Sequence, residues 1–269
     1  MTKILDKLCE IYCFVDDFLQ TNAQISNWRR SNHRNPRLTD AEILTIALMQ
    51  SEFGTESLRK TFSLIEENFG AEFPALCGYK QFIRRLHRLT KIVERLFTST
   101  ASFYQSSVYL IDAKPIPVCQ AARHRRVRLL RDDGAYFGKT SKGWFFGFKL
   151  HVLATAEKKI CNVVLTPGNY ADRRVAECLT EFLSSQTVIG DLGYRGLKLQ
   201  DELLEENNCL LITKQDARRR NRRLPPIRQR IEAGFSILWH HFIDRVFSRS
   251  WLGLWNTILL KLLFFNLFR

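Results

Sequence analysis

Two aspartates in this chain each follow a short run of apolar and β-branched residues. Asp112 ends the run 108–112 (VYLID), and Asp191 ends the run 187–191 (TVIGD). Runs this short, with this composition, favour buried strands over helices. Because ligands bind at the carboxyl ends of strands in an open α/β sheet, we expect both carboxylates to face one crevice.

A third acid, Glu232, lies in a segment whose apolar residues recur with helical spacing. Three carboxylates in one crevice repel one another, and hard divalent cations are suited to neutralise them. This set of residues is typical of a two-metal phosphoryl-transfer site. On spacing alone, Glu232 fits equally well as an ordinary surface glutamate paired with Arg228 one helical turn away.

The charge of the chain favours a polyanionic partner. The 269 residues include 41 Lys and Arg against 27 Asp and Glu, a formal net charge of +14. The excess gathers around Glu232, because residues 216–269 carry 11 basic and 3 acidic side chains. Seven of these are arginines within 218–230. We expect Arg219, Arg222 and Arg228 to contact phosphates there.

A second basic segment, 123–131, has five arginines in nine positions. In a loop near the acids, such side chains anchor the nucleic-acid backbone without reading its sequence. Arg125 and Arg126 are the candidates for this role. The alternative is a solvated charged loop.

The seven cysteines are scattered and form no CxxC pair. This pattern predicts reduced, mostly buried thiols and neither a disulfide framework nor a zinc site. No secretory segment is evident at the N-terminus, where an acid interrupts the apolar run. A cytoplasmic protein is expected.

Two further strands, 144–153 and 160–165, are predicted to form a hairpin between the two aspartates. Lys149 and His151 alternate with apolar residues and therefore share one face of the first strand. Lys149 is a candidate phosphate contact. A lone strand histidine is more often simply hydrogen-bonded than chemically active. After the hairpin, the pattern predicts helices over 172–184 and 197–207 and strands ending at 191 and 213.

The first hundred residues are predicted to be helical. Residues 1–20 have helical periodicity, and Thr39 with Glu42 forms a capping box before an apolar run. Further helices are expected at 56–68 and 79–98. The second of these has a basic face that fits either a DNA-reading element or the solvated side of an amphipathic helix.

The last apolar stretch, 251–268, is long enough to suggest a membrane span. It contains Lys261, Asn256 and Asn266, however, so a core helix that completes the catalytic domain is the favoured interpretation, with no membrane partner.

Five motifs occur in order along the chain. They are LID ending at Asp112, GFKLH at 147–151, PGNYAD at 167–172, GDLGYRG at 190–196 and RQRIEAGF at 228–235. Together they resemble the catalytic domain of bacterial insertion-sequence transposases of the DDE type. The resemblance covers about 105–265, and the segment 38–43 also resembles the N-terminal region of one such group.

The resemblance implies an α/β fold: an RNase H-like mixed sheet flanked by helices over 101–269, preceded by an all-helical, DNA-end-binding domain over 1–100. The strands bearing Asp112 and Asp191 would lie side by side, with the Glu232 helix across them. These three acids would be catalytic and hold two Mg²⁺ ions, with Mn²⁺ able to substitute. Lys149 and Arg195 would contact phosphates.

The activity implied is Mg²⁺-dependent cleavage at the ends of an insertion sequence, followed by strand transfer. The partners would be double-stranded DNA, as element ends and as target, and a second copy of the chain in a homodimeric synaptic complex. Pro225 and Trp239 stand where related groups carry Tyr and Lys, so a hairpin intermediate that depends on those side chains is not implied. The alternatives are a DNA-binding protein without catalysis and an RNase H-like nuclease that cuts without joining.

Overall fold

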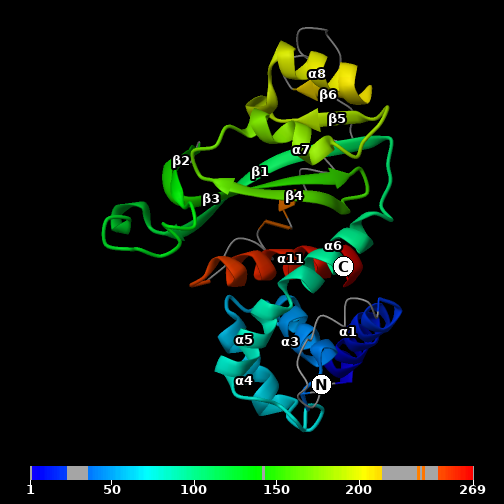
Figure 1. Cartoon of the computed structure of the whole chain (residues 1–269), viewed down its shortest axis with the longest axis vertical. Helices are drawn as coiled ribbons and strands as arrows, with labels where there is room; N and C mark the ends of the chain where they lie inside the picture. Colours follow the sequence, from blue (N-terminus) through cyan, green and yellow to red (C-terminus); the bar gives the residue numbers. More distant parts are fainter. Residues whose placement is uncertain are drawn as a thin grey trace. The chain divides into compact units, whose positions relative to one another are not determined.

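The chain divides into two compact units, which we call the helical unit (residues 1–97 and 245–269) and the sheet unit (residues 98–244). The structure is a computed structural model that describes residues 2–22, 36–140, 143–213, 235–236, 238–239 and 248–268. Figure 1 shows the elements of both units along the chain. Each unit is described by itself below.

The described elements of the helical unit are all helices, as the sequence predicts for this region. They are α1 (Thr2–Thr21), α3 (Asp40–Glu52), α4 (Leu58–Asn68), α5 (Tyr79–Arg88), most of α6 (Thr90–Ala101) and α11 (Trp251–Phe268). The predicted capping box is confirmed, since the Thr39 hydroxyl accepts a hydrogen bond from the Glu42 amide and the Glu42 carboxylate accepts one from the Thr39 amide.

The segment predicted as one helix over 79–98 is two helices. Leu89 separates them: its amide still donates to the carbonyls of Arg85 and Leu86, but its backbone leaves helical geometry. Thr90 then begins α6, and its hydroxyl donates to the carbonyl of His87. The apolar periodicity continues across this break, which is why the sequence pattern conceals it.

The C-terminal helix α11 belongs to the helical unit and not, as expected, to the catalytic domain. It packs against α3 and α5. The Asn256 amide donates to the Leu86 carbonyl (3.1 Å), and the Trp255 indole donates to Glu94 (2.9 Å). By length and composition α11 passes as a membrane span, but 72% of it is buried inside the protein, as in a core helix. A helix that is apolar on every side has no single apolar face, so its sequence does not predict which elements it packs against.

The sheet unit is built on a six-stranded mixed sheet. Its strands are β1 (Val108–Cys119), β2 (Tyr136–Thr140), β3 (Gly143–Thr155), β4 (Ile160–Pro167), β5 (Thr187–Gly190) and β6 (Leu210–Thr213). The order is β2-β3-β1-β5-β6, and β4 also pairs with β3. The pairs β1–β5 and β5–β6 are parallel, whereas β1–β3, β2–β3 and β3–β4 are antiparallel. The predicted hairpin and the adjacency of the strands that lead to Asp112 and Asp191 are therefore confirmed.

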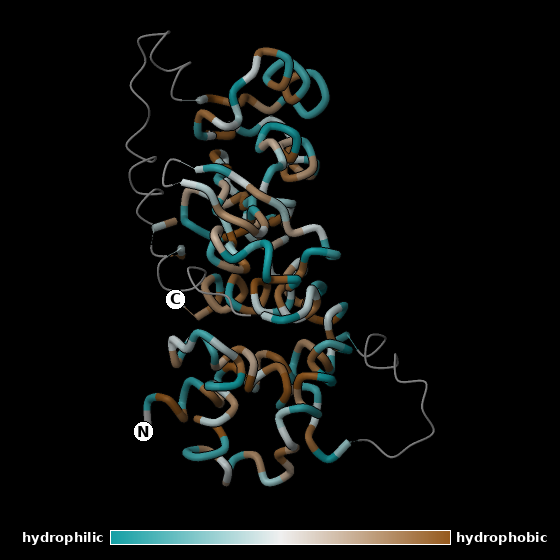
Figure 2. Tube along the Cα trace, turned by 90° about the vertical axis from the view of Figure 1, so that its left-hand side faces the viewer, coloured by the Kyte–Doolittle hydropathy of each residue, from teal (hydrophilic) through white to brown (hydrophobic). Residues whose placement is uncertain are grey.

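One face of this sheet carries the core of the unit. Tyr109, Ile111 and Leu153 from the strands pack there with Leu179 and Leu203, which come from α7 (Ala176–Thr180) and α8 (Leu197–Asn207). The helix predicted over 172–184 is shorter than expected: a 3-10 turn η2 (Asp172–Val175) leads into α7. Figure 2 shows apolar and polar stretches alternating along the chain, as expected for elements with one buried side.

Candidate active site

Asp112 and Asp191 stand side by side because of the register of two parallel strands. Leu110 is paired with Ile189 and Ile111 with Gly190, and the next residue on each strand is the aspartate. The ladder of β5 ends at this point, whereas β1 continues. Both carboxylates therefore lie where β5 ends, with Asp191 exposed and Asp112 partly buried.

The Asp112 carboxylate is held by two hydrogen bonds. The amide of Ala113 donates to Oδ1 (2.9 Å), and the indole Nε1 of Trp239 donates to Oδ2 (3.2 Å). The pKa of Asp112 is raised to about 6: burial is the main cause, the two hydrogen bonds oppose it, and the negative charges of Asp191 and Asp172 add to it. Negative charge thus accumulates at this position.

Trp239, which donates to Asp112, is itself held by two neighbouring side chains. Its ring stacks on Phe235, with centroids 5.7 Å apart, and the ammonium of Lys114 lies 5.6 Å from its centroid. In the sequence Trp239 was noted only as a departure from related groups. The contact with Asp112 was missed, because its two ends are 127 positions apart.

The turn after Asp191 is anchored by one buried side chain, Tyr194. It forms a short 3-10 segment, η3 (Leu192–Tyr194), which begins directly after Asp191. A Cβ added to Gly190 would lie 3.1 Å from side-chain atoms of both Ile111 and Tyr194, so the absence of a side chain lets Tyr194 fold back against β1. Tyr194 is almost fully buried, and this fixes the backbone that carries Asp191.

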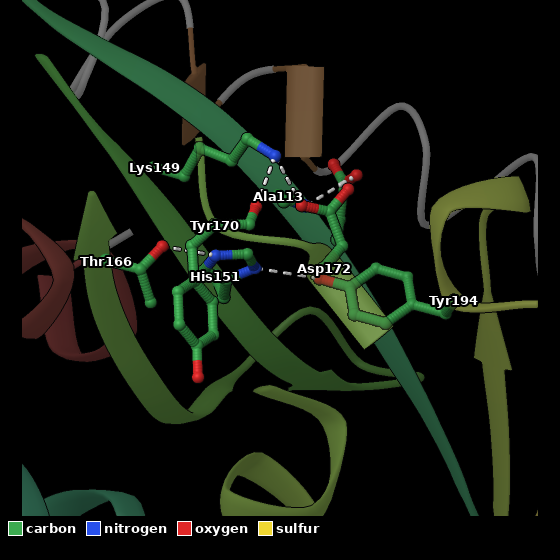
Figure 3. A network of polar contacts seen from close by, with 8 residues as sticks. Ala113, Lys149, His151, Thr166, Tyr170, Asp172 and Tyr194 are labelled. Carbon is green, nitrogen blue, oxygen red and sulfur yellow. Dashed lines mark hydrogen bonds and ion pairs between the residues drawn. The ribbon is translucent and has the colours of Figure 1, made fainter. Parts of the chain in front are cut away.

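His151 lies beneath this turn in a hydrogen-bond network (Figure 3). Its Nδ1 is 3.2 Å from the Tyr194 hydroxyl, and its Nε2 is 2.9 Å from the Thr166 hydroxyl. The side chain is fully buried, and burial lowers its pKa to about 4. A neutral imidazole between two hydroxyls is a structural hydrogen-bonding group, in line with the structural role favoured for a lone strand histidine.

Lys149 leaves the sheet on the same face as His151, as its alternation predicts. Asp112 lies opposite Val152, so it leaves the sheet on the other face. The Lys149 ammonium is bound by Asp172 Oδ1 and by the carbonyl of Tyr170, each at 2.8 Å (Figure 3). Asp172, although part of a quoted motif, had no role assigned from the sequence.

The remaining candidate residues are only partly described. Arg195 follows η3 and is exposed, and Arg125 and Arg126 are exposed in the turns after η1 (Ala121–Arg123). Arg219, Arg222, Arg228, Glu232 and the neighbouring Pro225 lie outside the described residues.

The donor set fits a divalent cation in its chemistry. Asp112 and Asp191 offer carboxylate oxygens, the ligands that Mg²⁺ and Mn²⁺ prefer, and Asp191 is accessible from solvent. Within the described ranges, no group of three or more His, Cys, Asp or Glu side chains is gathered closely enough to hold a metal ion. The two aspartates are thus two of the three expected ligands, and the third, Glu232, lies beyond those ranges.

Comparison with known proteins gives one family. Residues 104–231 match the family model described as "Transposase DDE domain". The matched range includes Asp112 and Asp191 and ends one residue before Glu232. Neither the curated proteins nor the solved structures gave a match. Residues 104–231 are thus similar to the transposase DDE domain, and this match supports a DDE-type transposase.

Proposed function

We propose that this protein catalyses Mg²⁺-dependent cleavage at the ends of an insertion sequence and transfers the freed 3′ ends to target DNA. The observation that supports this best is the register of β1 and β5, because it sets two carboxylates side by side where a parallel ladder ends. The matched family supports the same chemistry. The strand order, with antiparallel β3 and parallel β5 on either side of β1, supports an RNase H-like sheet.

In this proposal Asp112 and Asp191 hold the cations together with Glu232. The helical spacing predicted from the sequence would put Glu232, seven residues before Trp239, on the same helix face as Trp239, and Trp239 contacts Asp112. When bound, two Mg²⁺ ions supply Lewis acidity for the attacking and the leaving oxygen. The protein's own contribution is to orient the carboxylates: Tyr194 fixes the Asp191 turn, and Trp239 and the Ala113 amide fix Asp112.

The DNA contacts are proposed from charge. Arg125, Arg126 and Arg195 are exposed and suited to phosphate backbones, and the arginines at 219, 222 and 228 would add to them. Lys149 is proposed as a phosphate contact near the acids. The N-terminal helical domain, residues 1–100, is proposed to bind element ends, and two copies of the chain would hold a pair of ends together in the cytoplasm.

The test is nicking of supercoiled plasmid that carries the element's own flanking DNA. We expect nicking that requires Mg²⁺ or Mn²⁺ and that Asp191→Asn lowers by about 10³-fold with DNA binding intact. Asp201→Asn, an exposed aspartate on α8, is the matched control. Wild-type nicking in Asp191→Asn would refute the assigned role.

A second measurement separates the alternatives. Capture of a labelled 3′ end into target DNA identifies a strand transferase, whereas nicking without capture identifies a nuclease that does not join. DNA binding without nicking under any divalent cation would leave only a DNA-binding protein.

A further inference from the structure

Asp172 lies between Lys149 and the turn that carries Asp191, which its place in the sequence does not predict. It begins η2, directly after the turn that follows β4, and its Oδ1 forms an ion pair with Lys149 at 2.8 Å. The two side chains are only 24% and 16% exposed, so the pair is mostly removed from solvent. The same ammonium is bound by the Tyr170 carbonyl. Lys149 is therefore fixed at two points by one turn (Figure 3).

The second oxygen of Asp172 lies against the turn that carries Asp191. A Cβ added to Gly193 would be 2.6 Å from Asp172 Oδ2, closer than real Cβ atoms approach. Gly193 is two residues after Asp191, so the absence of a side chain there permits this contact. Asp172 thus contacts Lys149 with one oxygen and the Asp191 turn with the other.

Asp172 also connects the two faces of the sheet electrostatically. Lys149 and Asp112 leave the sheet on opposite faces, yet the charge of Asp172 acts on Asp112 past the end of β5. Tyr194, beneath the turn, has its pKa raised by burial and then by the charges of Asp172, Asp112 and Asp191. The three carboxylates therefore act on the same small region, and Lys149 is a cation bound directly to one of them.

We propose that Asp172 is a positioning residue of this active site: it couples Lys149 to the turn carrying Asp191, and the pair sets the affinity of the catalytic aspartates for a divalent cation. This rests on the proposed function only in naming those aspartates as cation ligands. Asp172 adds negative charge beside them, and Lys149 offsets it. Removal of Asp172 should therefore weaken cation binding, and removal of Lys149 should strengthen it. An ion pair with a purely structural role would not give these opposite shifts.

The experiment is a titration of the full-length protein with Mn²⁺, in which free Mn²⁺ is followed by electron paramagnetic resonance. We expect Asp172→Asn to weaken Mn²⁺ binding and Lys149→Met to strengthen it, each by about 3- to 10-fold. The double variant should return close to the wild-type affinity. Glu202→Gln is the matched control, because it breaks the solvent-exposed Lys198–Glu202 pair on α8.

Nicking assays supply the second readout. Asp172→Asn should raise the Mg²⁺ concentration needed for half-maximal nicking and also lower the rate at saturating Mg²⁺, since Lys149 is then no longer held. Shifts of Mn²⁺ affinity in the same direction for both single variants, or no larger than for Glu202→Gln, overturn the proposal. If the wild-type protein binds Mn²⁺ with these opposite shifts but does not nick DNA, the proposed function fails while the coupling stands. If the protein has no Mn²⁺ site whose affinity is lowered by Asp191→Asn, both the proposed function and the coupling are overturned.

Discussion

The two units of this protein differ in how they bury charge. In the helical unit, Lys261 on α11 is 5% exposed, and burial lowers its pKa to about 8 against the opposing charge of Glu56. In the sheet unit, Lys149 is also largely buried, but an ion pair and a carbonyl hold it beside a group of acids. Both arrangements oppose folding, because the removal of each charge from water has a free-energy cost.

This difference between the two units indicates which buried charges belong to a functional site. The charges of the sheet unit gather at the end of β5, where Asp191 and Asp172 act on Asp112 and all three act on Tyr194. Shifted ionisation that comes from several mutually acting groups at strand ends is typical of functional sites, whereas a single buried lysine in a helical core is a packing feature. Three substitutions test this contrast.

The largest effect is expected at Asp112. Asp112→Asn should lower nicking by about 10³-fold and yet stabilise the metal-free protein by about 2 kcal/mol at pH 8. The folded pKa of about 6 lies above the ordinary value of 3.8 for an aspartate, so the folded state binds the extra proton. The stability that this provides is complete below pH 3.8 and is lost as pH rises through 6. The gain from Asn should therefore vanish near pH 4, as measured by urea unfolding at both pH values.

Mg²⁺ supplies a control for this result. The cation should stabilise the wild-type protein and leave Asp112→Asn largely unaffected. Equal stabilisation of both proteins by Mg²⁺ would contradict a role of Asp112 in cation binding.

A smaller effect is expected in the helical unit. Lys261→Met should raise the free energy of unfolding by about 1–2 kcal/mol at pH 7. The folded pKa of Lys261, about 8, lies below the ordinary lysine value of 10.5, so the destabilising effect of the buried ammonium is present at pH 7 and fades as pH rises through 8 and above. Unfolding in urea at pH 7 and pH 10 measures this. A loss of stability at pH 7 would mean that the buried ammonium stabilises the helical unit.

The smallest effect is expected at Trp239. The hydrogen bond from the Trp239 indole lowers the pKa of Asp112. Trp239→Phe keeps an aromatic ring at this position but removes that donor, so the pKa of Asp112 should rise. The acidic limb of the pH–rate profile for nicking should therefore move upward by about half a unit. Trp144→Phe, an exposed tryptophan on β3, serves as the comparison and should leave the profile in place. A downward shift for Trp239→Phe would show that the hydrogen bond does not favour the ionised carboxylate.

The sequence predicted the elements that lead to the site because each is encoded locally. Short apolar runs ending in Asp112 and Asp191 specify strands, and a run buried on both sides fits the middle of a sheet. The contacts that complete the site could not be predicted in the same way. Asp172 reaches Lys149 across 23 positions, and Trp239 reaches Asp112 across 127. Such contacts depend on how turns pack in space, and no local periodicity records that.

The same reasoning explains the placement of α11. Its composition predicted burial, which the structure confirms, but a helix without a polar face can complete any apolar core. The predicted helix over 79–98 was divided at Leu89 for a related reason: a break that keeps the apolar side in place leaves no trace in the pattern.

The unequal lengths of β1 and β5 have one more consequence. Past Asp112, β1 runs on to Cys119, but its parallel partner has ended at Gly190, so among the described residues only β3 pairs with this part of the strand. Pro115 and Pro117 lie there, and strands tolerate proline where the missing amide faces an open edge. An edge without these donors is a poor template for strand addition by another molecule. The margin of the sheet beside Asp112 and Asp191 is thereby protected from aggregation.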